Sequence, residues 1–271
     1  MRIPVPEMLR ERANQVVDAA PTRDAATVVV VRDGAEGIEA YLLRRQSSMA
    51  FAPGMYVFPG GGVDEADRDA DISWVGPPAS EWAARFGCSE DIARGLVCAA
   101  VRETFEESGV LLAGPDEHSI VADTSAASFQ EARLALEAHD LTFGAYLADA
   151  GLVLRTDLLG AWAHWITPRF EPRRYDTRFF VAVLPEGQSV GELAREADRA
   201  HWTPLSDVLA SVDAGTSAML PPTHVTCREL AGLAASDVLG AAALRNIRTI
   251  EPRLVEHDGE LFLETDLGDL S

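Results

Sequence analysis

The chain of 271 residues contains no lysine, so all 23 of its basic residues are arginine. This absence excludes a phosphate-binding loop of the Walker type and a Schiff base formed on lysine, because each of them needs a lysine side chain. Basic residues are also few beside 43 acidic ones, and the formal net charge is −20. Nucleic acids and anionic membranes bind to basic surfaces, so the charge argues against both as general partners.

Cysteine is scarce as well, with three residues, Cys88, Cys98 and Cys227, that show no paired spacing. This pattern argues against a disulfide framework and is typical of a reducing compartment. No apolar run has the length of a membrane-spanning helix, and residues 1–12 lack the apolar centre of a signal peptide. We therefore expect a cytoplasmic protein with no membrane partner. Its apolar content of 47% is sufficient for a substantial core.

Residues 89–110, SEDIARGLVCAAVRETFEESGV, have the periodicity of one helix that ends at Gly109, a residue suited to a left-handed turn. Glu103, Glu106 and Glu107 fall on one face of this helix, at spacing i, i+3, i+4. Carboxylates so close repel one another, and the helix macrodipole disfavours negative charge at this end. A solvated acidic helix end is the simpler interpretation by base rate. A bound divalent cation, which prefers carboxylate oxygens, would relieve the repulsion.

The segment RETFEESGV, from Arg102 to Val110, resembles the second half of the Nudix hydrolase box, G-x5-E-x7-R-E-U-x-E-E-x-G-U, where U is a bulky apolar residue. Upstream, FPGGGVDEAD resembles the opening of the box, with Gly61 as the first glycine and Asp67 where the family has glutamate. A much longer segment replaces the seven-residue gap of the family. Such an insertion marks a Nudix subgroup that includes a coenzyme A diphosphatase, and the phrases LLRRQSSMAFAPGMYVFPGG, WITPRFEPRRYDTRFF and LPPT also resemble that subgroup.

The resemblance implies an α/β fold, the Nudix α/β/α sandwich with a mixed sheet, as a single domain over residues 1–271. To this fold we add an N-terminal helix over 6–20, an insert at about 68–94 inside the box, and helical additions at about 120–160 and 205–245. We expect the insert to be an ordered irregular segment that forms a wall or lid of the pocket. The residue patterns themselves predict two hairpins, one from 26–32 and 38–45 and one over 253–264. The first run, ATVVVV, is continuously apolar and is expected to be buried on both faces.

The resemblance also implies an activity, the metal-dependent hydrolysis of a diphosphate linkage in a nucleoside diphosphate joined to another group. The implied ligands of Mg²⁺ or Mn²⁺ are Glu103, Glu106, Glu107 and the carbonyl of Gly60, and Arg102 would orient the carboxylates. Within the box Glu106 is our candidate for the general base. Glu196 and Asp198, on a distant segment, are the alternative bases.

Substrate phosphates need hydrogen-bond donors, and arginine supplies them in pairs. The candidate substrate-binding residues are Arg44, Arg45, Phe58, Gly61, Arg174, Tyr175 and Arg178. For any one of these arginines, pairing with a nearby acid is an equally good interpretation. An aromatic residue such as Phe58 is more often part of the core than part of a binding site.

The subgroup implies coenzyme A or acyl-coenzyme A as substrate, although its signature upstream of the box is only partly present. Arg45 and Gly54 match that signature, whereas Gln46 and Ala50 depart from it. Two alternatives stay open, namely an ADP-ribose or NADH pyrophosphatase and a regulator with a Nudix fold that binds such a metabolite without cleaving it. In each case the partner is a small nucleotide rather than a nucleic acid, and a homodimer is the expected state by base rate.

Overall fold

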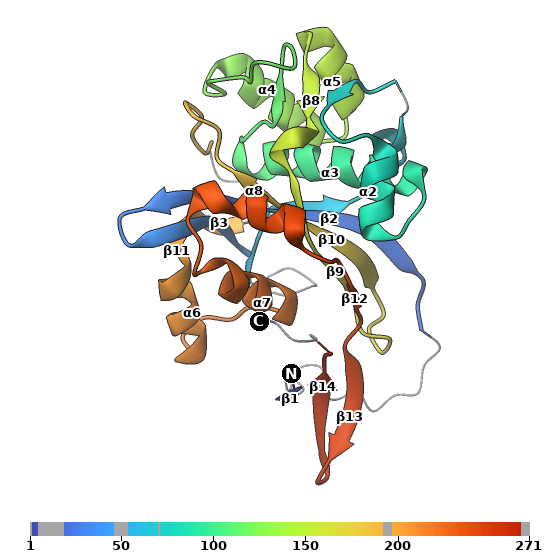
Figure 1. The fold of residues 1–271 in the computed structure, drawn as a ribbon, viewed down its shortest axis with the longest axis vertical. Helices are drawn as coiled ribbons and strands as arrows, with labels where there is room; N and C mark the ends of the chain where they lie inside the picture. Colours follow the sequence, from blue (N-terminus) through green and yellow to red (C-terminus); the bar gives the residue numbers. More distant parts are fainter. Residues whose placement is uncertain (1, 5–18, 46–53, 70, 192–196, 267–271) are drawn as a thin grey trace.

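The computed structural model of the chain describes residues 2–4, 19–45, 54–69, 71–191 and 197–266 (Figure 1). Except for its last two positions, the helix predicted over residues 6–20 lies outside the described residues. No helix in the described part of the chain is long and apolar enough to cross a membrane.

A mixed sheet in the order β11-β3-β2-β10-β9-β12 forms the centre of the molecule (Figure 1). Its longest strand, β2 (Thr22–Gly34), is antiparallel to β3 (Gly37–Arg45) and parallel to β10 (Arg174–Val183). The other strands are β9 (Gly160–Ile166), β11 (Ala197–Pro204) and β12 (Thr249–Ile250), with β4 (Tyr56–Val57) paired to β3 and β5 (Gly60–Gly62) paired to β2. The predicted hairpin of β2 and β3 is confirmed.

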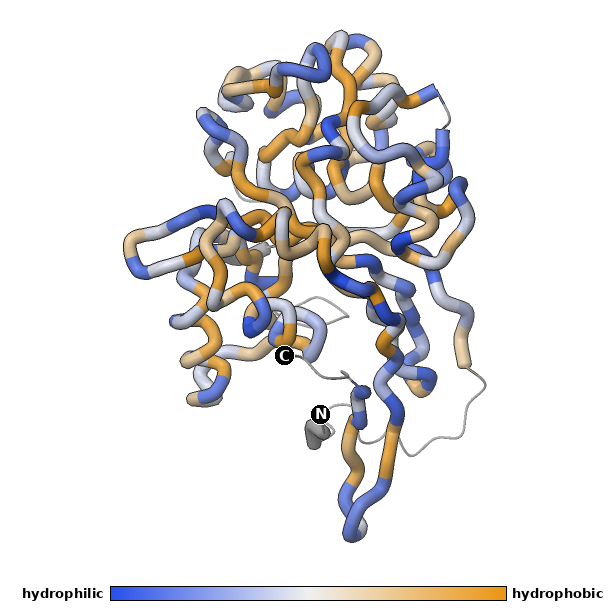
Figure 2. The backbone as a smooth tube through the Cα atoms, in the orientation of Figure 1, coloured by the Kyte–Doolittle hydropathy of each residue, from blue (hydrophilic) through white to orange (hydrophobic). Residues whose placement is uncertain are grey.

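Successive residues of β2 face two different cores, because side chains alternate along a strand. Val28 and Val30 pack into one core with helices α2 (Ala79–Phe86), α3 (Glu90–Ser108), α4 (Ala127–Glu137) and α5 (Phe143–Ala150). Val29 and Val31 pack into the other with α6 (Leu205–Asp213), α7 (Pro221–Leu230) and α8 (Ala235–Leu244). All four valines are fully buried, and apolar residues gather along the central strands (Figure 2). The α/β/α sandwich is confirmed.

The insert inside the box is more regular than we predicted. It begins in the short 3-10 helix η1 (Glu65–Arg68), continues through β6 (Trp74–Val75) and forms helix α2. Trp82 on α2 is 2% exposed, and its ring centroid lies 6.2 Å from that of Phe86 and 5.6 Å from that of Phe180. The expectation of irregular structure was wrong for this part, because Trp82, Ala83 and Phe86 together form an apolar helix face against the sheet.

The addition at 120–160 is only partly helical. Besides α4 and α5 it contains β8 (Val153–Arg155), which pairs with β6 from the insert and with β7 (Ala113–Gly114). A separate short sheet joins β1 (Arg2–Pro4), β14 (Glu260–Glu264) and β13 (Arg253–His257), and it extends away from the body of the molecule (Figure 1). Its turn has Asp258 at φ 53° and Gly259 at φ 80°, which confirms the second predicted hairpin.

Candidate active site

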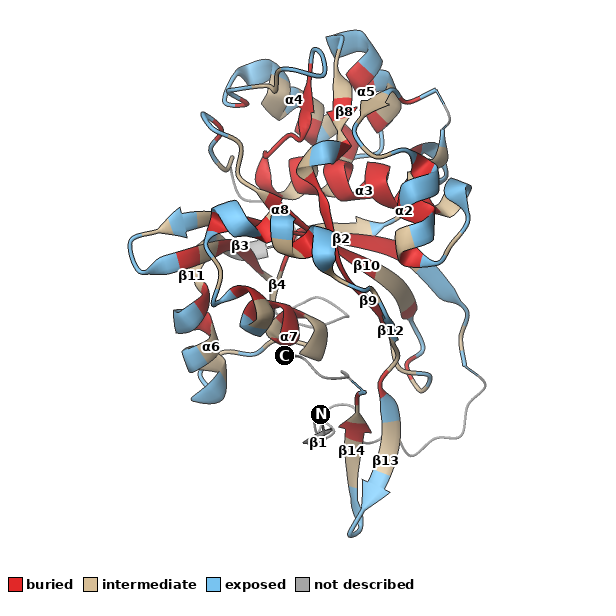
Figure 3. Ribbon diagram, in the orientation of Figure 1, coloured by how far each residue is buried: buried red, intermediate tan, exposed pale blue. Residues whose placement is uncertain are grey.

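Helix α3 carries the three glutamates of the box and is the most buried helix of its core (Figure 3). It begins after Ser89, whose hydroxyl accepts the N–H of Ile92, and it ends at Gly109 with φ 78°. Both ends therefore agree with the helix predicted over 89–110. Because the helix packs against β2 on one side and against α2 on another, its acidic C-terminal turn is held in a fixed position.

The glycines of β5 allow the backbone to pass directly beside these glutamates. A Cβ atom at Gly61 would lie 2.3 Å from Oε1 of Glu103, so no other residue fits there without moving that carboxylate. A Cβ atom at Gly60 would lie 2.4 Å from the carbonyl oxygen of Ala26. The N–H of Gly60 donates to Oε2 of Glu107 over 2.8 Å. Strand β5 thus brings the first half of the box into direct contact with the second half.

Arg102 joins the carboxylates of the site to one another. Its Nε donates to Oδ1 of Asp67 over 3.0 Å, and its Nη2 donates to Oδ2 of the same carboxylate over 2.8 Å. Its Nη1 donates to Oε1 of Glu103 over 2.8 Å and to Oε1 of Glu106 over 3.3 Å. The second N–H of Nη2 donates to the carbonyl oxygen of Gly62 over 2.9 Å. All five N–H groups of the guanidinium are used within the protein, so Arg102 positions carboxylates and has no donor left for a substrate.

Asp67 occupies the place of the first glutamate of the family's box and reaches Arg102 although it is one methylene shorter. The residue is 2% exposed and lies on η1. Its Oδ2 also accepts the N–H of Asp64 over 2.9 Å, and the thiol of Cys98 lies 3.5 Å from its Oδ1. Both oxygens of Asp67 are therefore engaged by protein donors.

Burial changes the acidity of the glutamates on α3. Loss of hydration raises the pKa of Glu103 to about 7, in spite of the opposing charge of Arg102. Burial raises the pKa of Glu106 as well, and Arg102 again opposes the shift. One arginine is shared among Asp67, Glu103 and Glu106, so a further cation beside them would keep the glutamates ionised at neutral pH.

The donor set fits a hard divalent cation, because carboxylate oxygens on a single helical turn are the ligands that such ions prefer. Among the residues that the structure describes, no three acidic, histidine or cysteine side chains already converge on one point. Glu103 and Glu106 turn toward Arg102, while Glu107 accepts the N–H of Gly60. Glu103, Glu106 and Glu107 are the residues that would hold such an ion.

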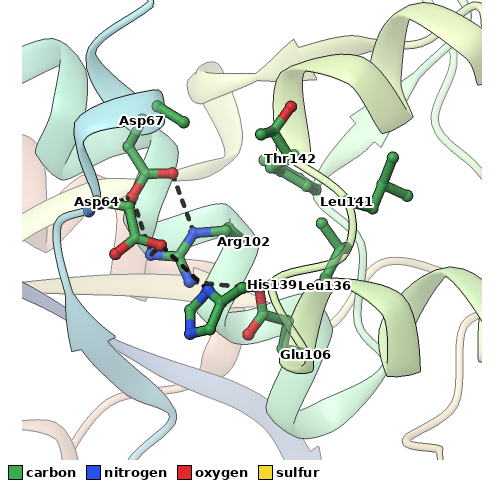
Figure 4. Close-up of a pocket in the computed structure, with 10 residues that line it drawn as sticks. Asp64, Asp67, Arg102, Glu106, Leu136, His139, Leu141 and Thr142 are labelled. Carbon is green, nitrogen blue, oxygen red and sulfur yellow. Dashed lines mark hydrogen bonds and ion pairs between the residues drawn. The ribbon is translucent and has the colours of Figure 1, made fainter.

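A pocket of about 70 Å³ opens beside Arg102 and Glu106 (Figure 4). The box lines it with Asp64, Ala66, Asp67, Arg102 and Glu106. The other lining residues are Leu136 at the end of α4, His139, Leu141 and Thr142 between α4 and α5, and Phe143 at the start of α5. No described residue of the insert at about 68–94 lines this pocket, and α2 packs against the sheet. The expectation that the insert forms a wall or lid of the substrate pocket stays a prediction. Asp64, His139 and Thr142 were missed, because isolated residues of these types show no motif spacing in the sequence.

Comparisons with known proteins identify the family of the chain. A family model described as the NUDT19 Nudix domain matches residues 83–230. The chain belongs to this Nudix hydrolase family. It is 30% identical over 278 residues to the acyl-coenzyme A diphosphatase NUDT19 of Homo sapiens, which covers 85% of this chain and 71% of that protein. It is 25% identical over 199 residues to the Xenopus laevis protein of the same name, covering 60% of this chain and 52% of that protein.

A solved structure, the NUDIX hydrolase from Alicyclobacillus acidocaldarius, has a TM-score of 0.64 and 31% sequence identity. The match covers 82% of this chain and 96% of that one. The Nudix fold and the resemblance to coenzyme A diphosphatases, both expected from the sequence, are confirmed. Nudix hydrolases use divalent cations, which agrees with the carboxylate cluster on α3.

Arg174 and Arg178 of this Nudix hydrolase form internal ion pairs. Arg174 is 8% exposed, and it donates to Glu251 over 2.6 Å and to two backbone carbonyl oxygens. Arg178 pairs with Asp176 over 2.7 Å and with Asp24 over 3.4 Å. These contacts agree with the alternative interpretation given above, in which the arginine pairs with a nearby acid instead of binding substrate.

The remaining candidates for substrate binding lie on several strands. Phe58 is 3% exposed and belongs to the core that faces α6, α7 and α8, so it is not available for stacking on a nucleobase. Arg44 and Arg45 are half-buried at the end of β3, where Nε of Arg44 donates to the carbonyl oxygen of Gly54 over 3.4 Å. Tyr175, also half-buried, pairs its backbone with Thr167 at the start of β10.

Of the two alternative bases, Glu196 lies outside the described residues. Asp198 falls in β11, between the positions that pair with Arg45 and Arg44 of β3, and its side chain is not described.

Arg133 of α4 is a further residue that the sequence analysis missed. It is 6% exposed, and its Nε and Nη2 donate to the backbone oxygen of Glu106 over 3.3 and 2.9 Å. The guanidinium thus supplies positive charge at the C-terminal end of α3, where the helix itself has no basic residue. It also fixes α4, and with it one wall of the pocket, to the helix that carries the glutamates.

Proposed function

We propose that the protein hydrolyses the diphosphate linkage of coenzyme A or acyl-coenzyme A with Mg²⁺ or Mn²⁺. The arrangement of Glu103, Glu106 and Arg102 against the glycines of β5 carries this proposal, because it places two of the proposed metal ligands, held by one arginine, beside the glycines of the box. The names of the human and Xenopus relatives support an acyl-coenzyme A substrate. The three cysteines are free thiols, which supports a reducing compartment such as the cytoplasm.

The proposed reaction needs a bound divalent cation and the side chains that hold it in place. A bound divalent cation would neutralise phosphate charge and lower the pKa of a bound water. Glu103, Glu106 and Glu107 would hold the ion, together with the carbonyl oxygen of Gly60. Arg102 keeps the first two glutamates in place through Nη1.

Glu106 is our candidate for the general base. It lines the pocket, and its side chain is 9% exposed. A cation beside it would keep the carboxylate ionised at neutral pH, and so able to accept a proton. Arg44 and Arg45, at the end of β3, are the arginines that we propose for the substrate phosphates, because a guanidinium offers paired donors to phosphate oxygens.

The test is a turnover assay on a panel of diphosphates that holds coenzyme A, an acyl-coenzyme A, ADP-ribose and NADH. Wild type, Glu106→Gln and the control Glu117→Gln are compared with Mg²⁺, with Mn²⁺ and with a chelator, and products are separated by chromatography. Glu117 has a side chain that is 65% exposed, so its variant should resemble wild type. We expect metal-dependent cleavage of coenzyme A compounds that is lost only in Glu106→Gln.

Each other result points to another function. Preferred cleavage of ADP-ribose or NADH would reassign the substrate but keep the reaction. Binding of a panel member without cleavage, under every metal condition, would favour the regulator and reject hydrolysis. Sedimentation of the wild type would test the expected homodimer in the same preparation.

A further inference from the structure

The wall of the pocket opposite Glu106 contains one residue with an unusual backbone conformation. His139 follows the C-terminal end of α4 with φ 56°, in the left-handed region that glycine adopts most easily. Its N–H donates to the carbonyl oxygen of Leu136 over 2.8 Å, and the N–H of Asp140 donates to the carbonyl oxygen of Ala135 over 2.9 Å. The turn is therefore fixed by the backbone, and the imidazole has no part in forming it.

The side chain of His139 does not add to the stability of the core either. It is 76% exposed, and its Nδ1 lies 3.7 Å from Oδ2 of Asp64, across the mouth of the pocket (Figure 4). That distance is longer than a hydrogen bond. A position that would suit glycine thus holds an imidazole that faces the box.

The pocket is also short of hydrogen-bond donors for an anionic substrate. Asp64, Asp67 and Glu106 line it with carboxylates, and Arg102 has committed all five N–H groups to the protein. Among the described side chains that line this pocket, a donor to a ligand remains only on the imidazole of His139 and on the hydroxyl of Thr142. The hydroxyl accepts the N–H of Ala145 as the cap of α5, which fixes its position but leaves its own O–H able to donate.

We propose that His139 is a substrate-binding residue. Its imidazole N–H donates to an oxygen of the diphosphate when the diphosphate lies between α3 and the segment joining α4 to α5. This inference rests on the proposed function, since it assigns one contact within that reaction. A diphosphate held near the carboxylates of α3 would then receive a hydrogen bond from the opposite wall. The unusual conformation at residue 139 is then explained by the direction in which it places the side chain.

The test uses a substitution that should relieve backbone strain at residue 139 and weaken the binding of substrate. His139→Gly removes the imidazole and leaves a residue for which φ 56° involves no clash of Cβ. The matched control is Asp258→Gly, since Asp258 has φ 53° in the turn between β13 and β14, away from the pocket. His139→Asn is the conservative variant, because asparagine tolerates this conformation and retains a donor.

Kinetics with coenzyme A and Mg²⁺ and the midpoint of urea unfolding are measured for all three variants. For His139→Gly we expect at least a tenfold rise in KM, roughly the effect of losing one hydrogen bond to a charged group, with a smaller change in kcat. Its unfolding midpoint should equal or exceed that of wild type. His139→Asn should recover part of the lost affinity, and Asp258→Gly should leave KM unchanged.

Three results would overturn the inference. An unchanged KM in His139→Gly, with wild-type turnover intact, would reject the role of His139 alone and leave the proposed function standing. A lower unfolding midpoint accompanied by a proportional loss of kcat would mean that the imidazole stabilises the turn. If wild type cleaves no diphosphate of the panel, the proposed function fails and this inference falls with it.

Discussion

The substitution Asp67→Asn tests whether the ion pair between Asp67 and Arg102 holds the two halves of the box together. Asparagine keeps the shape of the side chain but replaces one carboxylate oxygen by an NH₂ group that faces the N–H groups of Arg102. The side chains of the pair are 2% and 6% exposed, so water cannot replace the lost bond. Removing one partner of a buried ion pair costs about 3–5 kcal/mol.

The lower end of that range applies here, because Arg102 keeps its bonds to Glu103 and Glu106. A loss of about 3 kcal/mol would lower the melting temperature of a chain of this size by roughly 6–12 °C. Urea and thermal unfolding of the metal-free protein measure the change. The control is Asp149→Asn, an exposed carboxylate on α5.

A stability of Asp67→Asn equal to that of wild type would refute this reasoning, since it would show that the glutamates alone balance Arg102. Asp67→Glu, which restores the residue of the family's box, adds a methylene to a filled site. It should cost about 1–3 kcal/mol through overpacking. A gain in stability from Asp67→Glu would mean that the site has room for the longer side chain.

Three further substitutions test other contacts of the site and its support. Gly61→Ala places a Cβ atom 2.3 Å from Oε1 of Glu103, so calorimetric titration should show weaker binding of Mg²⁺; unchanged affinity would remove Glu103 from the ligands. Arg174→Ala breaks the ion pair with Glu251 and should lower the free energy of unfolding by about 1–3 kcal/mol with KM unchanged, whereas a tenfold rise in KM would return it to substrate binding. Trp82→Ala should cost about 3–5 kcal/mol in urea unfolding, and a cost below about 1 kcal/mol would show that α2 contributes little to the core.

Features that depend on neighbouring residues could be predicted from the sequence. The bounds of α3 follow from its apolar period and from Gly109, and the turn at Asp258 follows from the Asp-Gly pair. The apolar run in β2 and the fold itself were also predicted, because the pattern and the family resemblance agree. The proximity of Gly61 to Glu103 follows from the two halves of the box.

Contacts between distant segments could not be predicted. Arg174 bonds Glu251 across 77 positions, and Arg133 bonds the backbone of Glu106 across 27 positions. Nothing in the local composition around these residues indicates such partners. The place of His139 in the pocket likewise depends on how α4 packs against α3, which the periodicity of α4 alone does not determine.

The insert inside the box has a consequence for the order of folding. Asp67 and Arg102 are 35 positions apart, and Gly60 and Glu107 are 47 apart, so the two halves of the box must close a long loop before they meet. An isolated helix α3 would present its glutamates without Arg102 being held by Asp67. If these glutamates hold the cation, we expect its binding to require the folded chain, and millimolar Mg²⁺ should then raise the midpoint of urea unfolding.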